Sequence, residues 1–216
     1  MPTLLLLLAL AAAPLAGQDV VLAGEFWAER APMINLGENA VSTETAVRRA
    51  LDEARWVFSG MLYGYSFAYT PSDAARRVAE ELEVKPLAEI VQGDPNLTVQ
   101  QVLDDGRRVT VLLRYALRDF QAARWEAWRS SALPSAGGAG SASFFKGHSE
   151  KITAVREAIK TAVREYVRLR VYNKPRRISG AAVLEQAPRI IVAEGAYRAD
   201  CRVRFMIDEL VPYTVY

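Results

Sequence analysis

Apolar and polar side chains alternate along residues 196–207, near the end of the chain. Tyr197, Cys201 and Phe205 fall on one face of this segment, and Arg198 and Arg202 fall on the other. A period of two residues is typical of a β-strand with one buried face and one face in water. It favours an antiparallel sheet covered on one side over a doubly wound parallel sheet, whose strands are buried on both faces.

The period of apolar residues changes several times along the rest of the chain. A spacing of three to four residues predicts helices over 42–62 and 149–172, the first capped by Ser42. Asp105 and Gly106 separate two alternating segments and predict a hairpin of strands over 97–103 and 109–117, because a tight turn needs a positive φ. The other expected elements are strands over 20–30, 63–69 and 178–192, a short helix that begins at 70–73 and ends before residue 86, and a short helix over 119–129.

This order of elements predicts an α+β fold. We expect a mostly antiparallel sheet with helices packed on one face and one long helix in the C-terminal half. Residues 18–216 are expected to form a single domain, with a flexible loop of Gly, Ser and Ala at 130–143. The alternative is a boundary at that loop, which would divide the chain into two lobes, 18–130 and 146–216.

The N-terminus has the features of a secretory signal peptide over residues 1–17. Residues 4–13 are apolar without interruption, which is too short for a bilayer span, and Pro14 follows them. Lipoprotein signals of similar composition end before a cysteine, but this chain has Gln18 at that position. The sequence therefore predicts a periplasmic or secreted protein that is not lipid-anchored and has no transmembrane segment after cleavage.

Several chemistries lack the side chains that they require. With one cysteine and one histidine, the chain has no Cys/His zinc set and no intrachain disulfide. Lys146 precedes Gly147, the reverse of the order in a phosphate-binding P-loop. The single histidine, His148, and Cys201 on a buried strand face give little basis for nucleophilic catalysis. We assign no catalytic residue, no cofactor and no metal from the sequence.

Positive charge is concentrated in residues 146–177. This segment has ten Lys and Arg and three Glu, a net charge of +7, while the whole chain carries +2 and the remainder therefore −5. Arg156, Lys160, Arg164 and Arg168 recur at every fourth residue and follow one face of the predicted helix. We interpret this basic stripe as a binding face for an anionic envelope component or an acidic protein, not nucleic acid. The alternative is that these charges pair with acids elsewhere in the fold.

Four aromatic rings alternate with small residues at 63–69. Tyr63, Tyr65, Phe67 and Tyr69 share one strand face, opposite Gly, Ser and Ala. Such a row of rings can form an exposed platform for sugar rings or an extended peptide. We expect instead that the rings lie in the core, because aromatic residues contribute strongly to core packing.

Residues 30–60 resemble the start of a known family. They contain Ala31, Pro32, Met33, Ile34 and Asn35, followed by an alanine- and arginine-rich helix over 46–54. This arrangement is similar to the N-terminal domain of the flagellar assembly protein FlgT and to related small exported lipoproteins. The resemblance implies an α+β envelope protein that acts in assembly, and it assigns a role to no individual residue.

Together these features predict a non-enzymatic exported envelope protein of the assembly or scaffold type. It would bind an anionic envelope component or partner protein through the basic stripe. The alternative function is a carboxylate-based hydrolase that acts on envelope glycans. A hydrolase of this kind needs two facing acids in a pocket, at least one of them a carboxyl group with a raised pKa.

Overall fold

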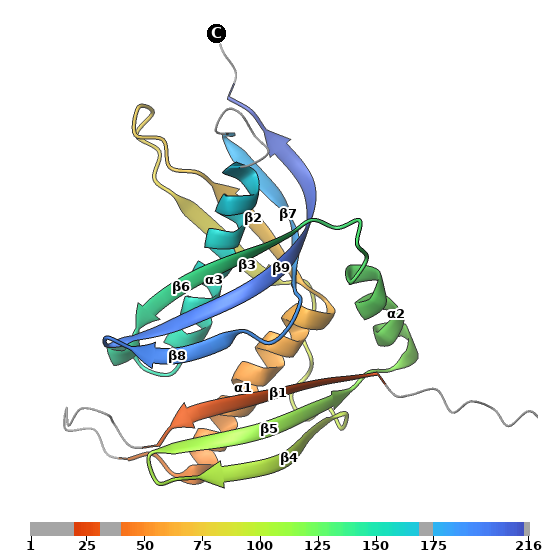
Figure 1. The fold of residues 1–216 in the computed structure, drawn as a ribbon, viewed down its shortest axis with the longest axis vertical. Helices are drawn as coiled ribbons and strands as arrows, with labels where there is room; N and C mark the ends of the chain where they lie inside the picture. The colour runs from red at the N-terminus through yellow and green to blue at the C-terminus, as the bar shows by residue number, and fades with distance from the viewer. Residues whose placement is uncertain (1–19, 31–39, 169–174, 214–216) are drawn as a thin grey trace, which may run out of the picture.

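The computed structural model describes residues 20–30, 40–168 and 175–213 (Figure 1). The expected signal peptide over 1–17, the segment 31–35 and the expected helical residues 169–172 lie outside the described residues. Along the described chain the elements are β1 (Val21–Glu29), α1 (Thr43–Leu62), β2 (Tyr65–Thr70), β3 (Glu81–Pro86), β4 (Leu97–Asp104), β5 (Arg108–Ala116), α2 (Asp119–Trp128), β6 (Ser135–Ser143), α3 (Glu150–Arg168), β7 (Arg177–Leu184), β8 (Arg189–Ala193) and β9 (Ala196–Val211).

The strands form two antiparallel sheets. The smaller sheet has the order β1-β5-β4, and the larger has the order β3-β2-β7-β9-β6, with β8 also paired to β9. Because β6 and β8 both pair with the first half of β9, they lie on opposite edges of it. The predicted α+β fold with mostly antiparallel strands and one long helix in the C-terminal half is confirmed.

The helix α1 lies between the two sheets and is the main link between them. Figure 1 shows α1 running from the three-stranded sheet towards the six-stranded sheet, and it contacts β1 and β5 of the first and β7 of the second. Ala46, Ala50 and Ala54 are fully buried along it, and Phe58 packs edge-on against Phe26 of β1 at 5.3 Å. One hydrophobic cluster contains core residues of both sheets.

The prediction of a flexible loop over 130–143 is wrong for residues 135–143, which form strand β6. This strand pairs with β9 over nine residues without a shift in register. A Cβ atom built on Gly138 would lie 2.1 Å from the carbonyl oxygen of Ala158 in α3, and one on Gly140 would lie 2.2 Å from its amide nitrogen. The glycines therefore allow α3 to lie directly on the strand backbone.

Two other expected elements differ in the structure. The predicted helix after Thr70 does not form. The chain instead makes a turn in which Asp73 Oδ1 accepts a hydrogen bond from the main-chain N–H of Arg76 (3.1 Å). An isolated β-bridge joins Asp73 to Val78, and strand β3 follows. The expected strand over 178–192 is divided into β7 and β8, with Pro188 between them. None of the helices in the described part of the chain combines the length and apolarity that a membrane span requires.

Strand β6 contains glycines that contact α3 and a glycine that does not, and substitution of one of each tests this packing. We expect Gly140→Ala to lower the free energy of unfolding by about 1–3 kcal/mol, because the methyl group meets helix backbone that cannot rotate away. Gly137→Ala is the matched control, since its Cβ would lie 3.8 Å from the nearest atom, the Cys201 carbonyl oxygen. Urea denaturation of both variants measures the difference. Equal stability of the two would contradict the close approach of α3 to β6.

Candidate functional site

The structure places the basic stripe along α3 and pairs most of it with acids. Lys160 forms an ion pair with Glu157 on the same helix. Arg168 pairs with Glu165 at 2.7 Å. Such exposed pairs stabilise a fold little, but they reduce the charge that a partner would meet.

Arg164 belongs to a network that reaches into the six-stranded sheet. Its Nε donates to Glu80 Oε1 (3.0 Å), and the hydroxyl of Tyr69 donates to the same oxygen (2.7 Å). Burial acts to raise the pKa of Glu80, but the hydrogen bonds from Tyr69 and Arg164 outweigh it, so the pKa lies below its ordinary value. The carboxylate is therefore held ionised opposite the guanidinium, 84 residues away in the sequence.

Arg156 is the one member of the stripe without an ion pair among the described residues. It is exposed, and its guanidinium carbon lies 5.8 Å from the ring centre of Trp56. Three of the four stripe cations are thus satisfied within the fold, which is the alternative that the sequence left open. The stripe does not present a row of free positive charges.

The aromatic row at 63–69 does not form an exposed platform. Tyr65, Phe67 and Tyr69 are at most 3% exposed and belong to the core. Tyr65 stacks on Trp56 at 4.6 Å and donates to its carbonyl oxygen (3.0 Å). Tyr63 is half-buried, and its hydroxyl accepts a hydrogen bond from Gln121 of α2 (2.8 Å). These rings stabilise the fold and offer no surface to a ligand.

A buried polar cluster joins α1, β1 and the start of α3. Lys151 is fully buried, and its Nζ donates to Glu53 Oε2 (2.6 Å) and to the Trp27 carbonyl oxygen (2.6 Å). His148 Nε2 lies 3.3 Å from the same Glu53 oxygen. Burial lowers the pKa of Lys151, although the neighbouring Glu53 carboxylate acts in the opposite direction.

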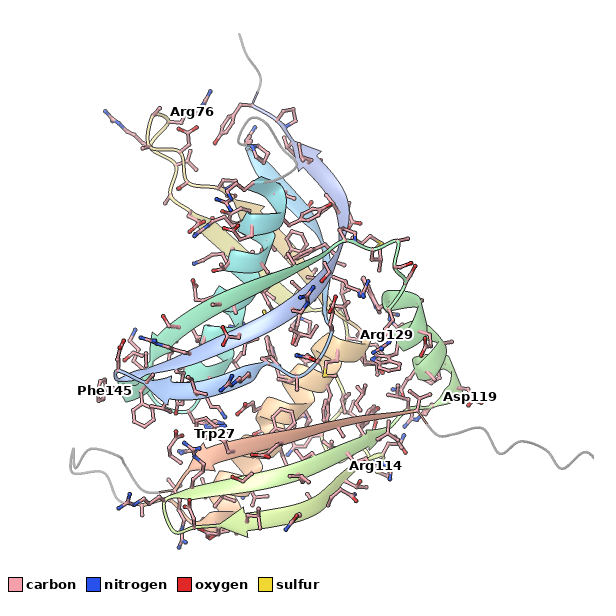
Figure 2. All side chains as sticks on the ribbon, viewed as in Figure 1. Trp27, Arg76, Arg114, Asp119, Arg129 and Phe145 are labelled. Atoms are coloured by element: carbon pink, nitrogen blue, oxygen red, sulfur yellow. The ribbon has the colours of Figure 1, made fainter. Side chains whose placement is uncertain are left out.

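The Trp27 ring lies against two cations of this cluster. Lys151 Nζ is 3.7 Å from the ring centre and the Arg108 guanidinium carbon is 3.9 Å from it, distances typical of cation–π contacts. A cavity of about 180 Å³ opens beside the cluster, lined in part by Trp27, Glu53 and Arg189 of β8. Figure 2 shows Trp27 at the end of β1, facing the larger sheet.

Lys151 and Glu53 form a satisfied ion pair, whereas both ring nitrogens of His148 beside them are buried without a hydrogen-bond partner among the described residues. Lys151 and Glu53 neutralise one another, and the Trp27 carbonyl oxygen accepts a second hydrogen bond from the ammonium group. The described residues contain no group of three His, Cys, Asp or Glu side chains able to hold a metal ion. Cys201 is buried, and burial raises its thiol pKa to about 12, which disfavours the reactive thiolate.

A groove beside α2 combines aromatic and cationic side chains. It has a volume of about 230 Å³, and Figure 2 shows Arg129 on the side of α2 that faces α1. We call it the α2 groove; its lining residues are Met61, Trp125, Trp128, Arg129, Val183, Leu184, Glu185, Gln186 and Arg204.

The helix α2 is attached to the fold mainly by one polar side chain. Gln121 is its only buried residue, and its Nε2 donates to the hydroxyls of Tyr63 (2.8 Å) and Tyr115 (3.0 Å). Trp125 and Trp128 are only partly buried. Both indole rings line the groove, and Trp125 also packs against the edge of the hydrophobic core.

The two arginines of the α2 groove differ in their partners. Arg204 donates to the Ser130 carbonyl oxygen (2.9 Å) and pairs with Glu185 (3.2 Å). Arg129 is exposed and stacks over Trp125 at 4.3 Å, without a carboxylate partner in the described structure. Arg129 is therefore the groove cation that remains available to an anionic group.

Sequence reasoning located the helix at 119–129 but did not assign the groove. The groove forms from α1, α2, the end of β7 and the middle of β9, which are far apart in the sequence. The available signal was that Trp125 and Trp128 share one helix face, whereas Phe120 lies about 140° from Trp125 around the helix axis. Large apolar residues without a common buried face indicate that some of them remain at the surface, and Phe120 is 62% exposed.

Comparison with known proteins gives a family but no activity. The model of a family of uncharacterised proteins matches residues 11–213. An uncharacterized protein of Treponema pallidum (strain Nichols) is 26% identical to this chain over 180 residues, which cover 83% of this chain and 76% of that protein. No solved structure matches the chain.

These comparisons overturn the resemblance to the N-terminal domain of FlgT and related lipoproteins. The matched family and the similar protein are both uncharacterised, and neither shows such a relationship. The resemblance depended on an alanine-rich helix. In the structure Ala46, Ala50 and Ala54 are buried at the packed face of α1, so their spacing reflects close packing and is not specific to one family.

Charge reversal on α3 distinguishes a paired stripe from a free one. We expect Arg164→Glu to lower the free energy of unfolding by about 1 kcal/mol, because it places a second carboxylate beside Glu80 on a partly exposed surface. Lys160→Glu, which loses only a helix pair, is expected to cost about 0.5 kcal/mol. The exchange Arg164→Glu with Glu80→Arg should restore stability in urea denaturation. Failure of the exchange to recover stability would contradict the pairing.

Removal of one partner from the buried cluster should cost more than removal of both. We expect Lys151→Met to destabilise the protein by roughly 3–5 kcal/mol, because Glu53 is left buried without its cation. Lys151→Met combined with Glu53→Leu should be less destabilising than Lys151→Met alone. A double-mutant cycle from denaturant unfolding measures this coupling. Simple additivity of the two changes would show that the ion pair does not hold the cluster together.

Proposed function

Because this chain belongs to that family of uncharacterised proteins over residues 11–213, we propose its function from the site itself: a non-enzymatic binding protein of the cell envelope. In this proposal the α2 groove holds an anionic group of a partner molecule. The observation that carries the proposal is the exposed Arg129, stacked on Trp125 at 4.3 Å and free of a carboxylate partner in the described structure.

The size of the α2 groove favours part of a large partner over a complete small molecule. Its volume of about 230 Å³ lies below the ~300–1,000 Å³ typical of small-molecule pockets. Tryptophan and arginine are the residue types that most often contribute the main binding energy at protein interfaces. A carboxylate or phosphate that projects from a polymer or a protein can meet Arg129 while its apolar stem contacts Trp128.

This proposal assigns anion binding to the α2 groove and not to the basic stripe on α3, where the sequence predicted it. Three of the four cations of the basic stripe already have carboxylate partners, so an incoming anion would have to displace them. Arg129 needs no such exchange. The assignment to the envelope depends on the apolar run at residues 4–13, which is typical of an export signal.

The lowered pKa values of five carboxyl groups argue against those groups as the acid of a glycan hydrolase. A glycosidase acid needs a raised pKa to hold its proton near neutral pH. In the described chain, hydrogen bonds lower the pKa values of Asp73, Glu83, Asp104 and Asp105 below their ordinary values, and that of Glu80 is lowered as well. These five carboxyl groups are therefore held ionised and are unsuited to the role of a general acid.

Anion binding at the α2 groove is testable by tryptophan fluorescence. We expect poly-L-glutamate or phosphatidylglycerol vesicles to change the emission of the protein, and added salt to reverse the change. Arg129→Glu should weaken this binding roughly tenfold, the effect of losing one charge-assisted contact. Arg124→Glu is the matched control, because Arg124 lies on the same helix but does not line the groove.

The two probes separate the possible sources of the anion. Binding to vesicles alone would indicate a lipid surface, and binding to the polypeptide alone would indicate an acidic protein. Equal affinity of the Arg129→Glu and Arg124→Glu variants would contradict the assignment of the groove. The absence of any salt-sensitive response to either probe would contradict anion binding itself.

A further inference from the structure

Strand β6 is an outer strand of the six-stranded sheet, and its free edge differs from the other edges of the fold. Figure 1 shows β6 beside β9, with no described strand on its other side. An unpaired edge presents a row of main-chain donors and acceptors that can pair with another chain, and natural proteins usually obstruct such edges. A comparison of the sheet edges therefore indicates which of them can accept an additional strand.

The other free edges each have an obstruction. Strand β3 has Glu81, Glu83, Lys85 and Pro86 along its six residues. Strand β4 has an irregular register between Val99 and Gln101, which interrupts its edge. Strand β8 has only five residues. In β1 the carbonyl oxygen of Trp27 is already bonded to Lys151.

Strand β6 has none of these obstructions. Its nine residues, Ser135–Ser143, include no charged residue and no proline, and they pair with β9 in one unbroken register. Its length of nine residues is within the usual range for a β-strand. Among the described edges, it is the one open to an additional strand.

The hydrogen-bond pattern shows which residues of β6 face the free edge. Phe205 N–H donates to the Pro134 carbonyl (2.9 Å), and Phe144 N–H donates to the Gly195 carbonyl (3.0 Å). Antiparallel pairing alternates, so the even-numbered residues between them also bond to β9. The main-chain groups of Gly137, Ala139 and Ser141 therefore point away from β9, and all three residues are exposed.

The charges behind β6 indicate the chemistry of the incoming strand. Gly137 lies opposite Arg202 of β9, Ala139 opposite Asp200 and Ser141 opposite Arg198, so two cations flank one carboxylate along this face. Because the β6 side chains are so small, side chains of an added strand can extend over them towards these arginines, across two strand spacings of about 4.8 Å each. Carboxylates four residues apart on the added strand match both guanidinium groups.

The present partners of these arginines do not prevent the exchange. Arg198 pairs with Glu194, and Arg202 lies 3.4 Å from Glu185. The side chains of both arginines are about half exposed or more, and surface pairs of this kind contribute little to stability. A partner carboxylate can therefore replace or join them.

We propose that the free edge of β6 receives an extended acidic segment of a partner protein as an additional β-strand. Its main chain pairs with Gly137, Ala139 and Ser141, and its carboxylates reach Arg198 and Arg202. A second copy of this chain fits the edge less well. Helix α3 lies directly over β6, so the two α3 helices of a symmetric pair would be about 4.8 Å apart, whereas packed helices need 8–10 Å.

The test uses the full chain and two nine-residue peptides rich in Val and Thr. One peptide has Glu at two positions four residues apart, and the other has Lys at the same positions. Hydrogen exchange followed by NMR reports on the individual amides. We expect the Glu peptide, and not the Lys peptide, to slow exchange at Gly137, Ala139 and Ser141. Exchange unaffected by the Glu peptide at millimolar concentration would overturn the proposal.

Two variants separate main-chain pairing from charge. Ala139→Pro removes an outward N–H without removing a bond to β9, and it should weaken Glu-peptide binding at least tenfold. If that variant is unfolded by circular dichroism, the double reversal Arg198→Glu with Arg202→Glu replaces it and should invert the preference to the Lys peptide. Retention of the Glu preference in the double reversal would refute the charge match.

Two further outcomes are distinguishable in the same data. Protection of the β6 amides that rises with protein concentration in the absence of peptide would show self-association and overturn the assignment to a partner protein. Arg129→Glu should leave Glu-peptide binding at β6 intact, because the α2 groove is a separate site. Loss of binding in that variant would place the peptide in the groove and not on β6.

Discussion

The ammonium group of Lys151 connects the parts of this fold more directly than any other single group. It is fully buried, and it bonds to a carboxylate of α1 and to a carbonyl of β1 while it stands on the first turn of α3. A buried charge is tolerated only where partners surround it, so the relative positions of these three elements are fixed together. Since α1 and β1 belong with the smaller sheet and α3 with the larger, the ion pair also fixes how the two sheets meet.

The arginines and glutamates at the surface have a related role. Arg164 is held by Glu80, Arg204 by Glu185, and Arg30 by Asp104 beside the β4–β5 turn of the smaller sheet. Within residues 146–177, four of the eight described cations, Lys151, Lys160, Arg164 and Arg168, have carboxylate partners, so about half of the concentrated positive charge is matched locally. Recognition of an anion then depends on the cations that remain unmatched, Arg129 among them, and on the aromatic surface beside them.

The sequence was informative where side chains report the environment of the backbone. Strand β9 and helices α1 and α3 were predicted because apolar residues mark one face of each. Strand β6 was missed because Gly, Ala and Ser do not alternate between apolar and polar side chains. Strand β3 was missed because Thr70 and Pro71 resemble a helix start, and the residues after them were therefore assigned to a helix. The stripe on α3 was located correctly, but its pairing with Glu80 is a contact across 84 residues. Neither that contact nor the assembly of the α2 groove has a local signature.

The contact between β6 and α3 also bears on how the chain folds. Gly140 and Ala158 touch across a short connection, with only a single turn of 3-10 helix between strand and helix. Contacts between residues close in sequence form quickly, because little chain entropy is lost when the loop closes. The contact of Lys151 with Glu53, by contrast, closes a loop of 98 residues. The β6–α3 unit is thus suited to form early, before α1 and β1 dock onto the end of α3 and complete the protein.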